Sequence, residues 1–269
     1  MKTILNVMLT ALAAAIFSCG CSQKSPNTFQ GYIEGEYVYI ASPLAGTLTN
    51  LPVARGNSVT NGQLLFELER GSETTALDAA KKNLEQAKAS LTLSESTYAR
   101  RKELRDGNGE VISAEELDQA KSKRDADAAQ VQSLQAALDK AKWSFDQKQQ
   151  FAPTNAFVQD TLYRQGEFIA AGNPVVVLLP PANIKVRFFV PETILPQIKI
   201  GQSVSVSFDG AAKPFSATVN FISTQNEFTP PVLYNRENRA KLIYMIEAGF
   251  SPADAAQLRP GQPVDVKLQ

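Results

Sequence analysis

The pattern of hydrophobic positions divides the chain into stretches with different periods. From about residue 72 to 150, apolar residues recur every three or four positions among strong helix formers, without any proline. On either side, short apolar runs lie between glycine, asparagine and proline residues, which is typical of strands joined by tight turns. Beyond Pro181, apolar and polar residues alternate, as they do in half-buried strands. The sequence therefore predicts a mainly β protein with a long helical insert.

The insert has the heptad spacing of a coiled coil on both of its arms. Each arm of roughly 35 residues would reach about 50 Å as a helix. We expect the arms to fold back on each other as an antiparallel hairpin, because the β segments on either side have to meet. The predicted seam of the first arm consists of Leu77, Ala80, Leu84, Ala87, Leu91, Ser94 and Tyr98. That of the second arm consists of Leu117, Val131, Leu134, Leu138, Ala141 and Phe145, with an interruption at Arg124.

The segment between the arms has the composition of a turn. Residues 105–110 read Arg-Asp-Gly-Asn-Gly-Glu, and Ser113 is followed three residues later by Glu116. This spacing predicts a capping box, in which each of the two side chains binds the backbone N–H of the other residue. Losing such a cap would cost about 1 kcal/mol.

The β segments that flank the insert contain an internal repeat. Each copy of about 30 residues is too small for a core of its own, so the two copies should pair. Pro43, Gly56 and Gly62 recur as Pro153, Gly166 and Gly172, and the differences 153−43, 166−56 and 172−62 all equal 110. Apolar positions agree in the same register: Leu48 with Val158, Val59 with Ile169, Leu65 with Val175 and Phe66 with Val176.

The first copy resembles half of a biotinyl or lipoyl domain, in the segments Ala-Ser-Pro-Leu-Ala-Gly-Thr-Leu at 41–48 and Val-Ala-Arg-Gly-Asn-Ser-Val-Thr-Asn-Gly-Gln-Leu-Leu-Phe-Glu-Leu at 53–68. The resemblance implies a split lipoyl-like β module. In carrier enzymes of that type, a tight hairpin between the halves presents the lysine that takes the cofactor. Here the long insert occupies that place and no Met-Lys-Met signature is present, so no cofactor is expected.

The C-terminal region predicts a small closed β-barrel. Alternating apolar residues mark strands at 184–190, 204–208 and 217–222, and closure would remove their open edges. The pattern Gly-Gln-x-Val-x-Val-x-Phe at 201–208 returns as Gly-Gln-x-Val-x-Val-x-Leu at 261–268, the same turn before the same kind of strand. We expect two short helices beside the strands, one near Pro191 to Ile198 and one started by Ser251-Pro252.

Charge and composition exclude several function classes. Lys plus Arg equals Asp plus Glu at 27 each, which leaves no global basic field for a nucleic acid. Histidine is absent, and with it the commonest metal ligand and the commonest general base near neutral pH. Carboxylates of the arms alternate with lysine and arginine as on a solvated coiled-coil face, namely Glu85, Glu95, Asp125 and Asp127. We expect no catalytic, cofactor-binding or metal-binding residues, and no enzyme activity.

The N-terminus has the features of a secretory signal. An apolar segment from Ile4 to Phe17 follows Lys2 and is shorter than the roughly 20 residues that span a bilayer. The two cysteines of the chain, Cys19 and Cys21, come next among small residues. This arrangement resembles the lipobox of bacterial lipoproteins, which implies a lipid anchor at Cys21 or at Cys19. The alternative is an ordinary cleaved signal, and either way the protein leaves the cytoplasm.

The order of these segments resembles that of HlyD-type membrane fusion proteins, the periplasmic adaptor subunits of tripartite efflux and ABC export systems. On this resemblance, residues 1–21 are a lipoprotein signal, 29–70 and 151–181 the two halves of the lipoyl-like module, 71–150 the hairpin and 182–269 the barrel. The segment Phe228-Thr229-Pro230-Pro231, with Arg236 and Arg239 beyond it, resembles the barrel of adaptors that serve ABC exporters.

In that family, an arginine, a leucine and a serine near the hairpin tip dock onto an outer-membrane duct of the TolC type. The matching residues here are Arg100, Leu104 and Ser113, although the spacing between the last two is longer than in the family. The alternative is that Ser113 only caps a helix, that Leu104 ends the seam and that Arg100 is solvated.

The resemblance implies a lipid-anchored periplasmic adaptor, held on the inner membrane, that links an inner-membrane ABC exporter to the duct and self-associates into rings of six. Three alternatives stay open. The chain could be an adaptor of an RND-type multidrug efflux pump, a carrier subunit of a biotin- or lipoate-dependent enzyme, or a coiled-coil lipoprotein with no role in transport.

Overall fold

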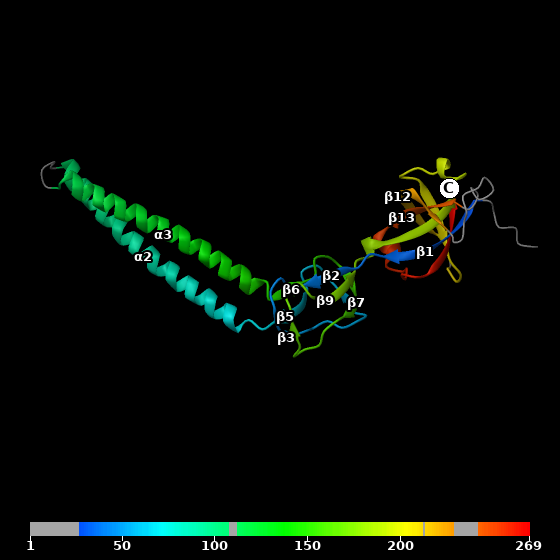
Figure 1. Cartoon of the computed structure of the whole chain (residues 1–269), viewed down its shortest axis with the longest axis horizontal. Helices are drawn as coiled ribbons and strands as arrows, with labels where there is room; N and C mark the ends of the chain where they lie inside the picture. The colour runs from blue at the N-terminus through cyan, green and yellow to red at the C-terminus, as the bar shows by residue number, and fades with distance from the viewer. Residues whose placement is uncertain (1–26, 108–111, 212, 229–241) are drawn as a thin grey trace, which may run out of the picture. The chain divides into compact units, whose positions relative to one another are not determined.

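The computed structural model describes residues 27–107, 112–211, 213–228 and 242–269. The chain forms two compact units. One unit spans Glu36–Pro181, and the other combines Ala182–Gln269 with the N-terminal stretch that ends at Gly35. The first unit holds a helical hairpin on a small β module, and the second is a β-barrel (Figure 1). The predicted fold class, mainly β with a long helical hairpin, is confirmed.

The β module consists of two four-stranded sheets, and each sheet takes strands from both halves of the repeat. One sheet has the order β2-β9-β7-β4 and the other β6-β5-β3-β8. The first half supplies β2 (Val38–Ala41), β3 (Gly46–Asn50), β4 (Ser58–Val59) and β5 (Leu64–Leu68). The second half supplies β6 (Gln149–Phe151), β7 (Ala156–Thr161), β8 (Phe168–Ile169) and β9 (Pro174–Leu179).

The two halves exchange matching hydrogen bonds. The N–H of Gly56 donates to the carbonyl oxygen of Val158 at 2.9 Å, and the N–H of Gly166 donates to that of Leu48 at 2.8 Å. Gly56 and Gly166 have φ angles of 91° and 93°, in the region that glycine enters without a Cβ penalty. The repeat in the sequence is therefore a pseudo-twofold repeat in space.

The apolar residues that the repeat aligned form the core of the module. Leu48, Val158, Leu65 and Phe66 are fully buried, and Ile169 is nearly so. Each half buries its apolar face only against the other half, which is why the two pair although a long insert separates them in sequence.

The hairpin consists of α2 (Gly71–Gly107) and α3 (Ala114–Asp146), which lie side by side along their length (Figure 1). Leu77, Leu84 and Ala87 are buried, while Leu91 and Tyr98 are half-buried. On α3, Leu117, Val131 and Leu138 are half-buried. The predicted seam thus forms the contact between the helices, although a two-helix layer leaves part of each seam residue exposed.

The barrel closes in the order β1-β10-β13-β12-β11-β14. Its alternating strands point Val186, Phe188, Val204, Val206 and Val266 into a fully buried core. Its strands are β1 (Thr28–Gly35), β10 (Ile184–Pro191), β11 (Ser203–Ser207), β12 (Phe215–Phe228), β13 (Leu242–Phe250) and β14 (Pro263–Leu268). Short helical turns lie at η1 (Pro181–Asn183), η2 (Leu195–Gln197) and α4 (Pro252–Ala255), the last two where short helices were predicted.

Strand β1 differs from the sequence-based boundary, which assigned residues from 29 onward to the lipoyl-like module. It pairs instead with β10 and β14 of the barrel and buries Phe29 and Ile33 there. Gly31 permits this pairing, since a Cβ at this position would lie 2.7 Å from the Cβ of Phe188. The chain therefore enters the barrel first and returns to it after residue 181.

Candidate partner-binding site on the helical hairpin

The predicted tip residues lie where α2 ends and α3 begins, at the end of the hairpin opposite the β module. Arg100 and Leu104 are exposed on the last turns of α2, and Ser113 is exposed at the start of α3. Leu104 leaves 46% of its surface accessible, so it is not a buried seam residue. Residues 108–111 of the predicted turn lie outside the described residues. The described part of the tip therefore exposes both Arg100 and Leu104.

Ser113 is the N-cap of α3, in the predicted capping box. Its hydroxyl accepts from the N–H of Glu116 at 3.1 Å, and its own N–H donates to Glu116 Oε2 at 3.0 Å. The carboxylate of Glu116 accepts hydrogen bonds from the backbone N–H of Ser113 and from its hydroxyl, and these two bonds, the backbone one first, lower the pKa of the Glu116 carboxyl. The cap is confirmed, while a contact between Ser113 and a partner stays a prediction.

Arg101, which the sequence analysis did not single out, ties the two arms together below the tip. Its Nη1 donates to the carbonyl oxygen of Glu116 at 3.0 Å. Arg101 occupies a seam position seven residues after Ser94, so the heptad register could have identified it. This bond fixes the start of α3 against the end of α2.

A polar layer interrupts the hairpin seam. The prediction that Asp127 lies on the solvated face is wrong, because Asp127 is only 9% exposed at the seam position seven residues before Leu134. The carboxylate accepts from Lys123 Nζ at 2.5 Å, and Ser94 is also buried. Next to this layer, the guanidinium of Arg124 lies 4.5 Å from the ring centroid of Tyr98, a cation–π contact.

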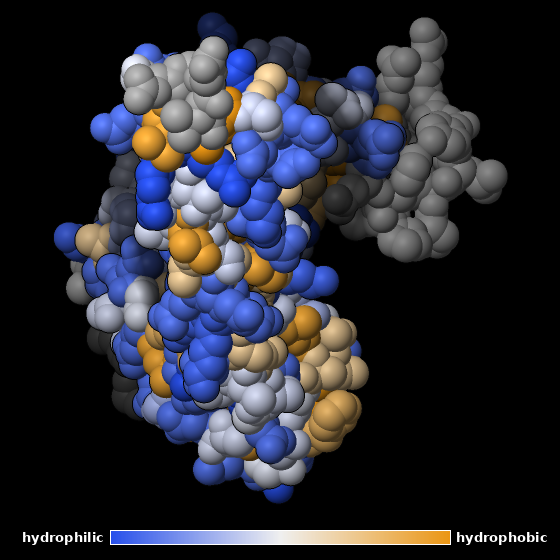
Figure 2. All heavy atoms as spheres, turned by 90° about the vertical axis from the view of Figure 1, so that its left-hand side faces the viewer, coloured by the Kyte–Doolittle hydropathy of each residue, from blue (hydrophilic) through white to orange (hydrophobic). Residues whose placement is uncertain are grey.

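Two grooves run between the helices beside this polar layer. One has a volume of about 360 Å³ and the other about 330 Å³, and Ser90 and Asp127 line both. The face of the molecule in Figure 2, which looks onto the hairpin end, is mostly hydrophilic with small separate hydrophobic patches. One large apolar side chain at the groove is Leu93, with 68% of its surface exposed.

A buried lysine holds the base of the hairpin on the β module. Lys148, 5% exposed, donates from Nζ to the carbonyl oxygen of Ala45 at 2.7 Å and lies 3.2 Å from Glu73 Oε1. Burial alone would raise the pKa of Glu73, but hydrogen bonds from its own backbone, Ser72 and Lys148 outweigh it and lower that pKa. Lys148 thus connects the first turn of α2, the exit from α3 and the loop before β3.

The outer side of the barrel carries a charged cluster across three strands. Glu247 on β13 accepts from Lys185 Nζ at 2.6 Å and from Arg187 Nη2 at 2.7 Å, and Arg187 also pairs with Glu34 on β1. Burial would raise the pKa of Glu247, but the hydrogen bonds from Lys185 and Arg187 outweigh it, so the pKa is lowered. This cluster joins β1 to the strands of the C-terminal region.

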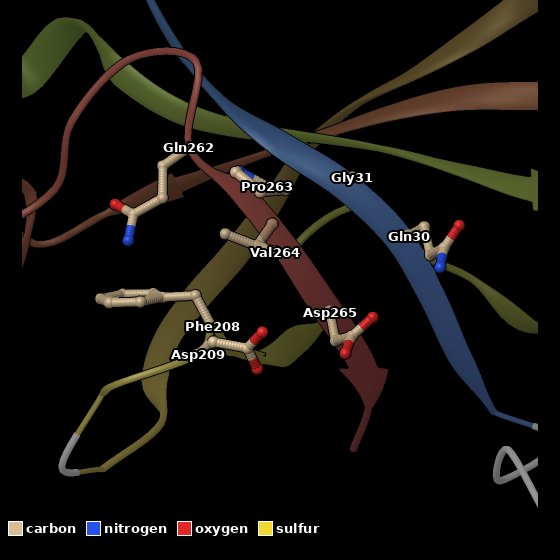
Figure 3. Close-up of a pocket in the computed structure, with 8 residues that line it drawn as sticks. All are labelled: Gln30, Gly31, Phe208, Asp209, Gln262, Pro263, Val264 and Asp265. Atoms are coloured by element: carbon tan, nitrogen blue, oxygen red, sulfur yellow. The ribbon is translucent and has the colours of Figure 1, made fainter.

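A separate cavity of about 450 Å³ lies at the edge of the barrel where β1 and β14 adjoin the end of β11 (Figure 3). Two of its side chains are exposed carboxylates, Asp209 and Asp265. Among the described residues, no group of three His, Cys, Asp or Glu is placed to hold a metal ion. The complete lining is Gln30, Gly31, Phe208, Asp209, Gln262, Pro263, Val264 and Asp265.

The predicted lipid-anchor residues, Cys19 and Cys21, lie outside the described residues. In the part of the chain that is described, no helix is both long and apolar enough to span a bilayer. Arg236 and Arg239 of the predicted barrel turn are likewise not among the described residues.

Comparisons with known proteins match the hairpin and the fold. Residues 76–148 match the family model described as "RND MFP, alpha-helical hairpin domain". A UPF0194 membrane protein of Yersinia enterocolitica is 28% identical, with 99% of this chain and 98% of that protein covered.

Two solved structures have similar folds. The membrane fusion protein Spr0693 from Streptococcus pneumoniae R6 superposes with a TM-score of 0.65 at 17% identity, covering 90% of this chain and 98% of that one. A putative efflux transporter from Bacteroides eggerthii gives a TM-score of 0.61 at 19% identity, covering 93% of this chain and 73% of that one. The chain thus has the fold of membrane fusion proteins, with their helical hairpin domain at residues 76–148.

Proposed function

We propose that this protein is a periplasmic adaptor of the HlyD type, which links an inner-membrane exporter to an outer-membrane duct of the TolC type. The observation that carries the proposal is the hairpin. A helix of 37 residues is about 55 Å long, and it presents exposed Arg100 and Leu104 at its far end. The contribution of the chain is structural, and it neither makes nor breaks bonds.

The base of the hairpin supports this role. A hairpin can place its tip at a defined point only if its base is fixed. Here Lys148 fixes the base on the β module through buried polar contacts with Glu73 and the carbonyl of Ala45. The adaptor would thus present its tip as a positioned surface.

We propose an ABC-type exporter as the inner-membrane partner. The support is the segment that begins at Phe228, which resembles the barrel of adaptors that serve ABC exporters. An RND-type pump is the alternative, and the description of the matching hairpin model favours it. Purification of the complex from its own cells, followed by mass spectrometry of the inner-membrane partner, separates the two.

The proposal includes a lipid anchor at Cys21, or at Cys19, that holds the protein on the inner membrane, and rings of six copies. Because a single acyl chain binds a membrane only marginally, we expect the barrel to add contacts to the exporter. Mass measurement of the mature protein tests the anchor, since an acylated cysteine adds the mass of its lipid.

The tip residues give the sharpest test. A photo-crosslinking residue at Asn108, between the two helices in sequence, should capture an outer-membrane duct protein in living cells. Leu104→Asp should abolish this capture, because a charge replaces the apolar side chain that would enter the duct surface. Lys102→Asp is the matched control, since it places the same charge on an exposed neighbour, and it should leave capture intact.

A coiled-coil lipoprotein without a transport role is the second candidate, because the hairpin alone would also support oligomerisation. Capture of the same chain and no duct from Asn108, with a reactive probe and normal expression, would favour this candidate over the adaptor.

A further inference from the structure

The seam of the hairpin changes chemistry partway along the helices. We call residues 71–93 and 128–146 the base half, and residues 94–107 and 114–127 the tip half. Every seam position of the base half is apolar, namely Leu77, Ala80, Leu84, Ala87, Leu91, Val131, Leu134, Leu138, Ala141 and Phe145. The seam positions of the tip half are mixed, namely Ser94, Tyr98, Arg101, Arg105, Leu117, Ala120, Arg124 and Asp127. Because apolar burial is the main attraction between helices in water, the two arms attract each other less in the tip half.

The polar layer of Ser94 and Asp127 lies at the boundary between the two halves. Lys123 donates to Asp127 Oδ1, but the buried Oδ2 has no hydrogen-bond partner within the described part of the chain. Lys123 first, against the effect of burial, and then the nearby Ser94 hydroxyl lower the pKa of Asp127. That hydroxyl has one proton, which it donates to the carbonyl oxygen of Leu91 at 2.9 Å. A buried acceptor without a donor costs free energy, so this layer holds the helices together less well than an apolar pair would.

The packing between the helices is incomplete at the same level. The groove of about 360 Å³ extends from Ser90 toward the turn as far as Arg101, and the groove of about 330 Å³ extends from Ser90 toward the β module as far as Asn83. Asp127 lines both grooves, so they meet beside the polar layer. Side chains beside a gap lose packing contacts, which weakens the contact between the helices there.

Helix α2 itself is weaker beside the polar layer. Four hydroxyl side chains within six residues donate to carbonyl oxygens three or four positions earlier in the helix, at 2.8 to 2.9 Å. They belong to Thr92, Ser94, Ser96 and Thr97. Hydroxyls that bond back to the helix in this way slightly destabilise it and often bend it. Serine and threonine also have lower helix propensities than the alanine, leucine and lysine that dominate elsewhere in α2.

Beyond the polar layer, polar contacts join the two arms of the tip half. Arg101 Nη1 donates to the carbonyl oxygen of Glu116 at 3.0 Å, and the guanidinium of Arg124 lies over the ring of Tyr98. Each of these contacts connects one arm of the tip half with the other, and neither reaches the base half. The tip half therefore has contacts of its own that form or break together.

We infer that the tip half opens as one cooperative unit, with the polar layer as its boundary, while the base half stays paired. Proteins open locally in contiguous units of this kind, and the units with few buried apolar contacts open first. The end of the hairpin can thus change conformation without disturbing the contacts of Lys148 that hold its base. This inference goes beyond the proposed function, because it concerns the hairpin itself and holds with or without a duct.

Amide hydrogen exchange of the purified full chain tests the boundary. We expect similar protection throughout the tip half, a step at residues 94 and 127, and at least about tenfold stronger protection in the base half. Val131→Ala, which trims a half-buried seam residue of the base half, should speed exchange there about threefold and leave the tip half unchanged. Equal acceleration of both halves would mean that the hairpin opens only as a whole, which would overturn the inference.

A variant with an apolar layer tests whether the tip half opens as one unit. Ser94→Ala combined with Asp127→Leu should slow exchange about tenfold at every amide of the tip half. The matched control is Ser96→Ala combined with Ser122→Leu, which removes a hydroxyl bond of the same kind and places the leucine on an exposed position. The control should change exchange less than about twofold. Slowing confined to amides beside residues 94 and 127, or no slowing, would contradict a cooperative unit. Duct capture from Asn108 is read separately, so failure of the adaptor function is distinguishable from failure of this inference.

Discussion

At the scale of single residues, we expect the buried ionised side chains to affect stability more than the exposed ones. Lys148 and Glu247 are 5% and 9% exposed, and both make short contacts with groups of opposite charge or with a carbonyl oxygen. Removal of one partner from such a site leaves the other partner desolvated and unpaired, which costs more than loss of an exposed ion pair. The two residues therefore allow separate tests of the two units.

Lys148→Met should lower the free energy of unfolding of the unit that holds the hairpin by about 2 kcal/mol. The methionine keeps much of the apolar stem but leaves Glu73 and the carbonyl of Ala45 without their donor. Urea unfolding followed by circular dichroism measures the change. Lys142→Met removes an exposed pair with Asp146 and should change stability by less than about 0.5 kcal/mol. Equal effects of the two variants would contradict the role of Lys148.

Glu247→Gln should destabilise the barrel by about 2 kcal/mol at pH 7, because Lys185 and Arg187 lose their shared acceptor charge. The folded pKa of Glu247 lies below its ordinary value of 4.5, so its stabilisation is present above that value and is lost as pH falls through the folded pKa. Urea unfolding of both proteins between pH 7 and pH 3 should show the difference shrinking once the pH falls below the ordinary value of 4.5. A difference that grows on acidification would be inconsistent with this sign.

At the scale of elements, the hairpin depends on a narrow apolar seam with a polar layer in it. Leu84 lies in the apolar part and is 4% exposed, whereas Leu93, which lines a groove between the helices, is 68% exposed. Two leucines of one helix thus have opposite environments, which the heptad register predicts.

Leu84→Ala should destabilise the hairpin by about 3 kcal/mol, through lost burial and a partly filled space between the helices. Leu93→Ala should stay within about 0.5 kcal/mol in dilute solution. Thermal unfolding monitored by helical circular dichroism compares them, and a larger loss in Leu93→Ala would refute the seam assignment.

The elements also show which parts of the fold the sequence predicts. The cap at Ser113 and the seam leucines follow from local spacing, and the structure confirms them. The predicted end of the hairpin at residue 150 is too late, because α3 ends at Asp146 and Gln149–Phe151 form strand β6. Asp127 does not follow, because charged residues in helices are usually solvated and the alternation of carboxylates with lysines predicts an exposed face. Strand β1 could not be assigned to a sheet, since alternation predicts a strand but not its neighbours.

The burial of Lys148 cannot be predicted from the sequence, for a related reason. It lies among glutamines at the end of α3, and its burial depends on Ala45, which is 103 residues away in sequence. The tip residues are a different case, since the sequence selects Arg100 and Leu104 through a family resemblance and the structure places both on an exposed end.

At the scale of the whole molecule, the β module and the hairpin are separable within their unit. Strands β5 and β6 pair antiparallel, with Glu67 opposite Gln149, so the two points where the hairpin leaves the module are adjacent. The strands of the two halves of the repeat together enclose one complete core.

Replacement of residues 69–147 by an Asn-Gly turn, which joins the facing residues Leu68 and Lys148, should therefore leave a folded β module. Such a turn joins antiparallel strands with the correct twist, and the core contains no helical residue. Hydrogen exchange of the β5 and β9 amides should stay slow relative to a denatured control. Rapid exchange throughout both strands would mean that the module needs its hairpin.

The pseudo-twofold module also has a consequence for the order of folding. Matching positions of its two halves are 110 residues apart in the chain. The insert between the halves has about 80 residues, and closing a flexible loop of that length costs about 2.7 kcal/mol more in entropy than closing a loop of about four residues. Helix formation within 71–146 uses contacts between neighbouring turns and proceeds quickly, whereas distant strand pairing is slow. A hairpin that zips from its turn toward its base would deliver β5 and β6 to each other already aligned. The coiled coil would then act as a template during synthesis, before it has any partner to reach.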